Sequence, residues 1–267
     1  MRITVNGKDF DSACETTFEV RKELGNETDI IILNGFQIDE DREISEADVL
    51  NIISKGTMPK EEELESMMMA RHTPNVHNKM KYSKVAIAGL GGLGSNIAVM
   101  LARIGVGQLL LVDFDIVEPS NLNRQSYYIS HLGLSKTEAL KMQLVQINPF
   151  IKIETATVRV TEKNVKELFN GYDIVCEAFD KADAKSILVN TALAELPNIK
   201  IVSASGMAGY ESSNLIKTVN PVKRLYMCGD FENGAMPGRG LMAPRVQICA
   251  GHQANMILRL LLGIEDV

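Results

Sequence analysis

The sequence is poor in cysteine and has no long apolar run, and each scarcity excludes a class of protein. Its four cysteines form no C-x-x-C pair, which gives no support for a structural zinc site and predicts a reducing compartment. Apolar runs such as Leu109 to Val112 and Leu260 to Leu262 are far too short to cross a bilayer. The N-terminus lacks the apolar core of a signal peptide. We therefore expect a cytoplasmic protein without a membrane partner.

Basic charge is also scarce, because the formal net charge is -6. A chain without a basic surface is a poor partner for nucleic acid. Hydrophobic residues make up 45% of the 267 residues, which is enough to bury one large core and one small one.

Residues 1–58 have the pattern of a small α+β domain. Ile3 and Val5 alternate with polar residues before Asn6-Gly7, which predicts a hairpin. Residues 16–24 have helical spacing and end before a glycine. Short apolar strands are expected at 29–35 and 48–54. This order of elements predicts a β-grasp fold.

A charged, methionine-rich segment follows, and we expect residues 59–81 to form a linker helix. We expect Met67 to Met69 to cover a hydrophobic surface.

From residue 82 to 267 strands and helices alternate, which predicts an α/β domain with a Rossmann-like, mostly parallel sheet covered by helices on both faces. The expected strands are 84–88, 109–113, 152–158, 173–178 and 200–204, and the expected helices are 94–104, 135–147, 161–169, 183–194 and 244–262.

The first expected strand of this domain runs into a G-x-G-x-x-G loop formed by Gly89, Gly91 and Gly94. The first glycine allows a tight turn, the second lets a phosphate approach the backbone, and the third lets the helix pack closely on the strand. Gly92 lies inside the loop and joins the candidates for nucleotide binding. The helix that follows directs its free N–H groups at an anion.

Asp113 ends the next strand, 19 positions after Gly94. A carboxylate at about this spacing is suited to a ribose hydroxyl. The competing interpretation is a solvated acid at a strand end. Asp115 is a weaker candidate for a second polar contact. At this point NAD and ATP fit the pattern equally well.

The segment from Asp113 to Gln125 favours ATP. Asn121, Asn123, Arg124 and Gln125 follow the strand end, where ligands bind in open α/β sheets. A nicotinamide needs an apolar bed, whereas this segment offers amides and a guanidinium that can hold phosphate oxygens. The alternative is a solvated surface loop.

Two further positions complete the candidate site. Ser135 and Glu138 fit a capping box, which places Lys136 in the first turn of a helix. A cation is mildly unfavourable there because the helix dipole is positive at this end. A bound phosphate would explain the lysine. Asp180 ends an apolar strand and is a candidate ligand for Mg²⁺ between phosphates. It could equally be the N-cap of the helix expected from 183.

Together these motifs resemble the ubiquitin-activating-enzyme-like adenylyltransferases of the ThiF/MoeB/HesA family, and ThiF-type sulfur-carrier adenylyltransferases in particular. The resemblance covers about residues 70–262. It is carried by GLGGLGSN, LVDFDIVEPSNLNRQ, GLSKTEAL, INP at 147–149 and the strand that ends in Asp180. The Asp-Phe-Asp to Asn-Arg-Gln string is far more specific than the glycine loop.

The resemblance implies a role for each matching position. Asp113 would hold the ribose, and Asp180 would hold Mg²⁺. Asn121, Arg124 and Lys136 would contact the phosphates of ATP. The family also implies a homodimer in which an arginine before the first strand crosses to the partner, and Arg71 is a weak candidate for it.

The sequence departs from the family in two respects. The paired C-x-x-C motifs of many relatives are absent, and Cys228 is the only match for a reactive cysteine, with a packed core thiol as the better interpretation. Residues 1–58 resemble a ubiquitin-like sulfur carrier of the thiamine type. However, such carriers end in a free Gly-Gly, whereas this chain continues through SKGTMP.

We therefore expect ATP-dependent adenylation of the C-terminal glycine of a separate ubiquitin-like sulfur carrier, in thiamine biosynthesis, with release of pyrophosphate. One alternative is an NAD-dependent oxidoreductase. A second is a non-catalytic nucleotide-binding module whose own carrier-like domain fills the groove. A third is adenylation of a peptide or an RNA base, and the acidic balance argues against RNA.

Overall fold

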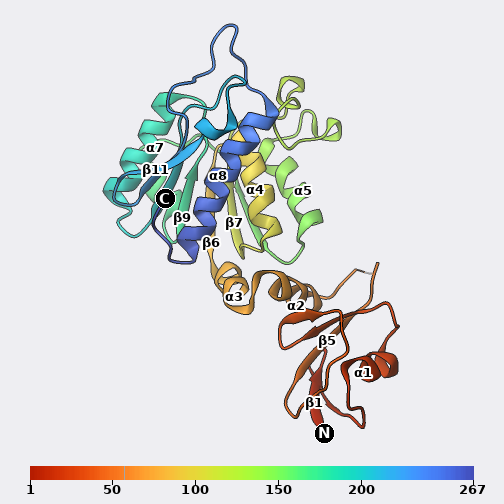
Figure 1. Cartoon of the computed structure of the whole chain (residues 1–267). Coiled ribbons are helices and arrows are strands. Elements are labelled where there is room, and N and C mark those ends of the chain that lie inside the picture. Colours follow the sequence, from red (N-terminus) through yellow and green to blue (C-terminus); the bar gives the residue numbers. More distant parts are fainter. Residues whose placement is uncertain (57) are drawn as a thin grey trace. The chain divides into compact units, whose positions relative to one another are not determined.

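The computed structural model describes residues 1–56 and 58–267 (Figure 1). The chain divides into two compact units, Met1–Lys79 and Met80–Val267. Thr57, part of the SKGTMP segment and of the expected 1–58 domain, lies outside the described residues.

The first unit is built on a five-stranded sheet with the order β2-β1-β5-β3-β4. Two of its hairpins have two-residue turns, Asn6-Gly7 and Asn34-Gly35, in which all four residues have positive φ. This geometry suits the right-handed twist of the strands and explains the Asn-Gly pairs. The strands are β1 (Arg2–Val5), β2 (Lys8–Asp11), β3 (Ile30–Leu33), β4 (Phe36–Ile38) and β5 (Val49–Ile53).

The small sheet is covered on both faces. Helix α1 (Thr17–Leu24) begins at a capping box between Thr16 and Glu19. Its Val20 joins a buried cluster with Ile31 and Ile52 of the sheet. Ile32 and Ile53 alternate to the other side and are 1% and 3% exposed. Helix α2 (Glu61–His72) packs against β3, β4 and β5, so α2 is the element that covers this second face.

The expected single linker helix is wrong, because two helices occupy the segment. Helix α2 ends at Thr73, whose φ of 71° and ψ of 148° cannot continue a helix. Pro74 then opens α3 (Pro74–Tyr82), as proline does at a first helical position. Met67 to Met69 are half-buried on α2, as expected.

The second unit contains a seven-stranded sheet with the order β11-β12-β10-β9-β6-β7-β8. All neighbours are parallel except β11, which runs antiparallel to β12. The fold class predicted from the sequence is confirmed. The strands are β6 (Lys84–Ala88), β7 (Gln108–Val112), β8 (Lys152–Ala156), β9 (Ile174–Glu177), β10 (Lys200–Ala204), β11 (Lys217–Val222) and β12 (Leu225–Gly229).

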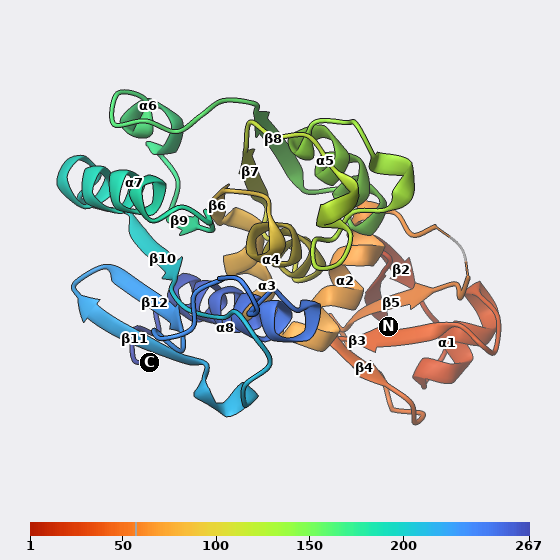
Figure 2. The same ribbon diagram turned by 90° about the horizontal axis from the view of Figure 1, so that it is seen from above.

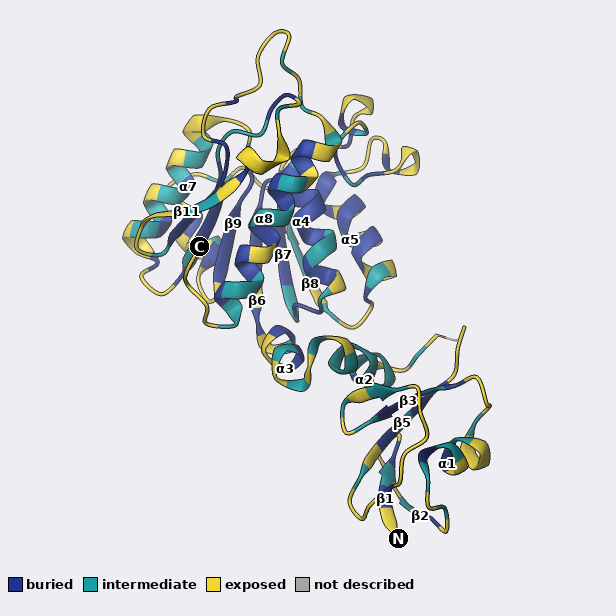
Figure 3. Ribbon diagram, in the orientation of Figure 1, coloured by how far each residue is buried: buried dark blue, intermediate teal, exposed yellow. Residues whose placement is uncertain are grey.

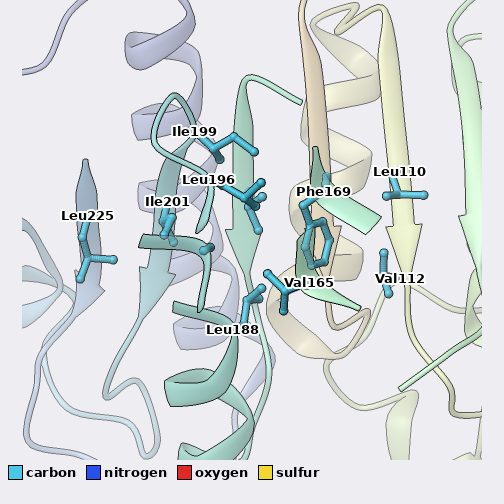
Figure 4. Close-up of a cluster of buried hydrophobic side chains, with 13 residues drawn as sticks. Leu110, Val112, Val165, Phe169, Leu188, Leu196, Ile199, Ile201 and Leu225 are labelled. Atoms are coloured by element: carbon cyan, nitrogen blue, oxygen red, sulfur yellow. The ribbon is translucent and has the colours of Figure 1, made fainter. Parts of the chain in front are cut away.

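Helices cover both faces of the large sheet, as Figure 2 shows from above. On one face are α4 (Gly92–Arg103), α5 (Lys136–Ile147) and α8 (Ala243–Leu261), and on the other are α6 (Val165–Phe169) and α7 (Ala182–Glu195). The inner strands β6, β7, β9, β10 and β12 are mostly buried and the edge strands β8 and β11 are not, whereas the helices expose their outer faces (Figure 3). Under α6 and α7, Phe169 and Leu188 pack on Val112 and Ile201 (Figure 4). In the described chain, no helix has the length and hydropathy needed to cross a membrane.

The strand order predicts a ligand-binding crevice at one end of the sheet. Strand β6 pairs with β7 on one side and with β9 on the other. The chain therefore reverses its direction of winding between β6 and β9, and ligands of open α/β sheets bind outside the carboxyl ends of the strands at such a point. The loops that follow β6, β7 and β9 carry the residues of the candidate site.

Candidate functional site

The glycine loop after β6 has the geometry that its three glycines predict. Gly89 has a φ of 92°, and a Cβ there would lie 2.8 Å from the Ala178 carbonyl oxygen. A Cβ on Gly94 would lie 1.8 Å from the Gly89 carbonyl oxygen. Gly91 is the N-cap of α4, and a Cβ on it would meet nothing nearer than the Gln125 amide nitrogen at 3.9 Å. The backbone is therefore tightly packed at Gly89 and Gly94, whereas the space beside Gly91 is free for an anion.

Asp113 holds the glycine loop from below. Its carboxylate is buried and accepts hydrogen bonds from the Leu90 N–H at 2.6 Å and the Asp115 N–H at 2.9 Å. The Tyr127 hydroxyl donates to the Leu90 carbonyl at 2.8 Å. Both the N–H and the carbonyl of Leu90 are therefore held by hydrogen bonds. This bracing role comes in addition to the predicted ribose contact, which stays a prediction.

The Asn-Leu-Asn-Arg-Gln segment is bound to the first turns of α4. The Ser126 N–H donates to the Ser95 hydroxyl at 3.0 Å, and the Ser126 hydroxyl donates to the Asn96 side chain at 2.9 Å. The Asn96 amide donates to the Arg124 carbonyl at 3.1 Å. Two motifs separated by about 30 residues therefore form one rigid wall of the crevice.

Arg124 lies beside the N-terminal end of α4. Its Cγ is 3.5 Å from the point that a Cβ on Gly92 would occupy. The guanidinium Nη1 donates to the Ser120 carbonyl at 3.0 Å and to the Asn123 side chain at 2.7 Å. A half-exposed cation is thus held next to the positive end of a helix, a combination suited to an anion.

Gln125 and Asn121 are both buried. The Gln125 side chain faces Gly91, and its carbonyl oxygen has no hydrogen-bond partner within the described chain. The Asn121 side-chain oxygen accepts from the Glu118 N–H at 3.0 Å and shapes the short 3-10 turn before Leu122. The side-chain oxygen of Gln125 can therefore still accept a hydrogen bond from a ligand, whereas that of Asn121 already accepts one within its own turn.

Lys136 is ion-paired with Asp115. The Lys136 Nζ lies 3.0 Å from a carboxylate oxygen of Asp115, and its N–H donates to the Asp115 carbonyl at 2.9 Å. Asp115 therefore compensates a buried cation in the first turn of α5, which needs no phosphate to explain it. The Ser135 hydroxyl caps α5 by accepting from the Glu138 N–H. The return bond of the expected capping box is missing, since the Glu138 carboxylate accepts from Thr155.

Asp180 follows β9 and is exposed. Helix α7 has Lys181 at its N-cap position, so the interpretation of Asp180 as the N-cap is wrong. No cluster of three metal-ligating side chains occurs among the described residues. Mg²⁺ that arrives with a triphosphate needs only one or two protein carboxylates, and an open carboxylate at this position fits that requirement.

Two buried ionic groups escaped the sequence reasoning. Glu177, the last residue of β9, is 0% exposed and paired with Lys185 of α7. Asp230, which directly follows β12, pairs with Arg245 of α8. In the sequence, the one feature that could have pointed to a buried Glu177 is a charged residue inside an otherwise apolar strand. No comparable sequence feature pointed to Asp230.

The pair of Asp230 and Arg245 ties two loops together. Burial alone would raise the pKa of Asp230, but hydrogen bonds from Asn233 and Glu232 and the Arg245 guanidinium lower it to about 2. Arg245 also donates to the carbonyls of Glu211 and Ser212. This network fixes the wall of the crevice beyond β12.

Cys228 and Arg71 are not placed for chemistry in the described structure. Cys228 lies in β12 with 0% exposure, and burial raises its pKa to about 11. A thiol of this kind is inert at neutral pH. Arg71 is exposed in the last turn of α2, in the first unit, and its role at the site stays a prediction.

A glycine loop at the switch point of a parallel sheet, with an acid under it and a cation beside it, defines a nucleotide-binding α/β protein. Residues 64–267 match the ThiF family, and residues 1–56 match the ThiS-like ubiquitin family. The chain therefore belongs to the ThiF family and carries a ThiS-like region in front of it.

Curated relatives are named as adenylyltransferases. The chain is 32% identical over 194 residues to the adenylyltransferase and sulfurtransferase UBA4 of Saccharomyces cerevisiae (strain RM11-1a), which covers 70% of this chain and 43% of that protein. It is 42% identical over 111 residues to a molybdopterin-synthase adenylyltransferase of Haemophilus influenzae, over 41% of this chain and 46% of that protein. The chain thus spans less than half the length of these relatives.

Solved structures share the fold. The Escherichia coli tRNA N6-threonylcarbamoyladenosine dehydratase TcdA, in complex with ATP, aligns with a TM-score of 0.69 at 21% identity, over 78% of this chain and 98% of TcdA. Escherichia coli MccB aligns with a TM-score of 0.58 at 20% identity, over 77% of this chain and 72% of MccB.

Proposed function

We propose that the chain is an adenylyltransferase that binds ATP with Mg²⁺ and activates the C-terminal carboxylate of a separate ubiquitin-like sulfur carrier. The observation that carries this proposal is the joint wall of the crevice. There the bonds from Ser95 and Asn96 to the 124–126 segment hold Arg124 against the start of α4. That geometry offers a triphosphate both a guanidinium and a helix N-terminus. The family and the names of its relatives support the same activity.

The reaction needs charge compensation more than proton transfer. The carrier carboxylate, with a reference pKa of about 3.5, is already ionised when it attacks the α-phosphate. One P–O bond forms to the carboxylate oxygen, the bond to pyrophosphate breaks, and an acyl-adenylate results. Arg124 would stabilise the charge on the phosphates, with Lys136 as a second cation, and Asp113 would hold the ribose while it braces the loop. Bound Mg²⁺ would neutralise phosphate charge, with Asp180 as its protein ligand.

The test is ATP–pyrophosphate exchange with a panel of carriers that end in Gly-Gly. The sequence predicts a thiamine-type carrier, whereas the relatives are named for molybdopterin synthase and for a sulfurtransferase. The panel should therefore include a thiamine-type, a molybdopterin-type and a tRNA-thiolation carrier. Exchange with any of them supports the proposal. Stabilisation by NAD but not by ATP with Mg²⁺ in a thermal-shift assay would overturn it in favour of an oxidoreductase.

The ThiS-like region would not be the substrate of its own chain. Its last strand, β5, leads through Lys55 and Gly56 into a chain that continues to α2. A carboxylate consumed in a peptide bond cannot be adenylated. We expect no exchange from the intact chain without an added carrier. If deletion of residues 1–56 leaves the rate with a separate carrier unchanged, a regulatory role of this region is lost.

The expected homodimer is also part of the proposal. Tyr128 and Ile129, beside the start of α5, are 59% and 77% exposed, and Met142 on α5 is 51% exposed. We take these exposed side chains as candidates for the contact between the two copies. Sedimentation equilibrium of the intact chain tests this directly, and a monomer at micromolar concentration would remove Arg71 from the partner's site.

A further inference from the structure

Glu177 is the most deeply buried charged side chain described in the second unit, and the proposed reaction does not use it. Its relative exposure is 0%. Removing a carboxylate from water costs several kcal/mol unless good partners replace the water. Such a group at the carboxyl end of a strand beside the crevice needs a reason to be there.

Its partners come from three separate segments. The Lys185 Nζ of α7 lies 3.0 Å from both carboxylate oxygens and donates further to the Ala204 carbonyl at 3.0 Å. The Ser203 hydroxyl of β10 donates to Oε2. The Phe179 N–H donates to Oε1 at 2.7 Å. The carboxylate is therefore fully satisfied, and one of its bonds holds the turn that follows β9.

This turn touches the glycine loop. The Ala178 N–H donates to the Ala88 carbonyl at 2.8 Å. The Ala178 carbonyl and the Phe179 ring fill the space in which a Cβ on Gly89 would lie, at 2.8 and 2.9 Å. Asp180 is the next residue and is exposed, between this turn and Lys181, the N-cap of α7.

The remaining wall of the site is fixed by other groups. Asp113 and Tyr127 hold Leu90 at its N–H and its carbonyl. Gln253 of α8 donates to the main-chain carbonyl of Glu177 at 3.2 Å, which anchors the strand but not the turn. The glycine loop thus keeps its supports without the Glu177 carboxylate, whereas the turn at 178–180 loses one of its own.

We propose that Glu177 and Lys185 form a positioning pair that sets the orientation of the Asp180 carboxylate toward a nucleotide-bound divalent cation. This inference rests on the proposed ATP site. It predicts that loss of the pair weakens the metal-dependent part of nucleotide binding and largely spares the metal-independent part. A pair that serves stability alone would change neither.

The experiment measures the binding of a non-hydrolysable ATP analogue to the intact chain by isothermal titration calorimetry over a series of Mg²⁺ concentrations. The variant is Glu177→Gln with Lys185→Met, because removing both charges avoids an unpaired buried ion. We expect the Mg²⁺ concentration for half-maximal binding to rise by roughly tenfold, the low end for loss of a group that orients a metal ligand. The affinity without Mg²⁺ should change by less than about twofold.

A matched control is Arg224→Met. The Arg224 guanidinium donates to the carbonyls of Leu193, Leu196 and Ile199, at the amino ends of the strands and away from the crevice. This variant should lose stability and keep the Mg²⁺ dependence of the parent chain. It separates an effect of lower stability from an effect on the site, and circular dichroism shows whether each variant is folded.

Asp180→Asn supplies the second control. If the pair acts through Asp180, the double substitution should change the Mg²⁺ dependence in the parent chain but add little in an Asp180→Asn background. A folded double variant with unchanged Mg²⁺ dependence, or fully additive effects, would overturn the positioning role. Mg²⁺-dependent binding without carrier-dependent exchange would overturn only the proposed adenylation. A parent chain that binds no nucleotide would overturn both.

Discussion

The two units of the chain bury polar side chains for different purposes. In the first unit, Ser12 accepts from the Cys14 N–H and Asp29 from the Asn26 N–H within local turns, and Thr17 donates to Asp41 across 24 positions. In the second unit, buried charged side chains form ion pairs between separate elements. Glu177 joins β9 to α7, and Asp230 joins the loop after β12 to α8.

The two units also differ in net charge. Residues 1–79 hold 17 acidic and 9 basic side chains, a net charge of -8 within a total of -6 for the chain. The second unit therefore has a small positive balance, and Arg124 and Lys136 lie at its crevice. A ligand with several negative charges belongs in the second unit, whereas the first unit repels it.

The largest contrast between the units should come from arginine substitutions. Arg124→Ala removes the cation beside α4, and we expect ATP–pyrophosphate exchange to fall by about 10²–10³-fold, by analogy with the loss of one preorganised donor. Arg21→Ala in the first unit removes only a guanidinium stacked 4.0 Å over Phe18 and should leave exchange unchanged. Equal activity of the Arg124→Ala variant and the parent would refute its role.

Two helical glycines of the second unit sharpen the comparison. Gly94→Ala places a methyl group into the Gly89 carbonyl, so we expect a loss of about 1–3 kcal/mol in the free energy of unfolding and weaker nucleotide binding. Gly251→Ala in α8 meets no atom within 4 Å and should stabilise by about 0.5–1 kcal/mol. Urea denaturation measures both. A neutral Gly94→Ala variant would contradict the close packing of loop and helix.

Asp230 gives the second unit a pH-dependent share of its stability. Because its pKa is lowered to about 2 in the folded state, against about 3.9 when unfolded, its contribution is present above pH 4 and is lost as the pH falls through 2. Asp230→Asn should therefore cost about 2 kcal/mol at pH 7 and almost nothing at pH 2. Urea denaturation across this range tests the sign, and a penalty that persists at pH 2 would point to packing instead.

The smallest effect separates the thiols of the two units. Cys14 of the first unit is half-exposed, whereas Cys176, Cys228 and Cys249 are buried. Burial raises the pKa of Cys228 to about 11 and that of Cys249 to about 12. At pH 8 iodoacetamide should label Cys14 alone in the native chain, as read by peptide mass spectrometry. Cys228→Ala should keep exchange within about twofold, and rapid labelling of Cys228 would revive its reactive role.

Features that depend on residues close together in the sequence could be predicted. The glycine loop, the strand before it and Asp113 lie within one contiguous β-α-β pattern, so spacing alone placed them correctly. Strands 84–88 and 200–204 were predicted at their observed bounds. The edge hairpin of β11 and β12 was missed, because Asn220 and Pro221 interrupt its apolar alternation and its register shifts between Val219 and Val222.

The sequence did not predict what depends on distant partners. Tyr127 meets the Leu90 carbonyl across 37 positions, and Ser203 meets Glu177 across 26. No periodicity encodes such pairs, since they arise only when the strands lie side by side. Lys136 shows the same limit, because Asp115, 21 positions away, explains a cation that the dipole argument alone assigned to phosphate.

Helix α2 has a consequence for the integrity of the small sheet. It covers the side of β3 and β5 on which Ile32 and Ile53 are buried, and it begins directly beyond the residues that correspond to a carrier's free end. A protease that cut after Gly56 would release a five-stranded fragment with a bare aliphatic surface, prone to aggregate rather than to shuttle between enzymes. The small sheet therefore depends on the segment that follows it to cover its second face.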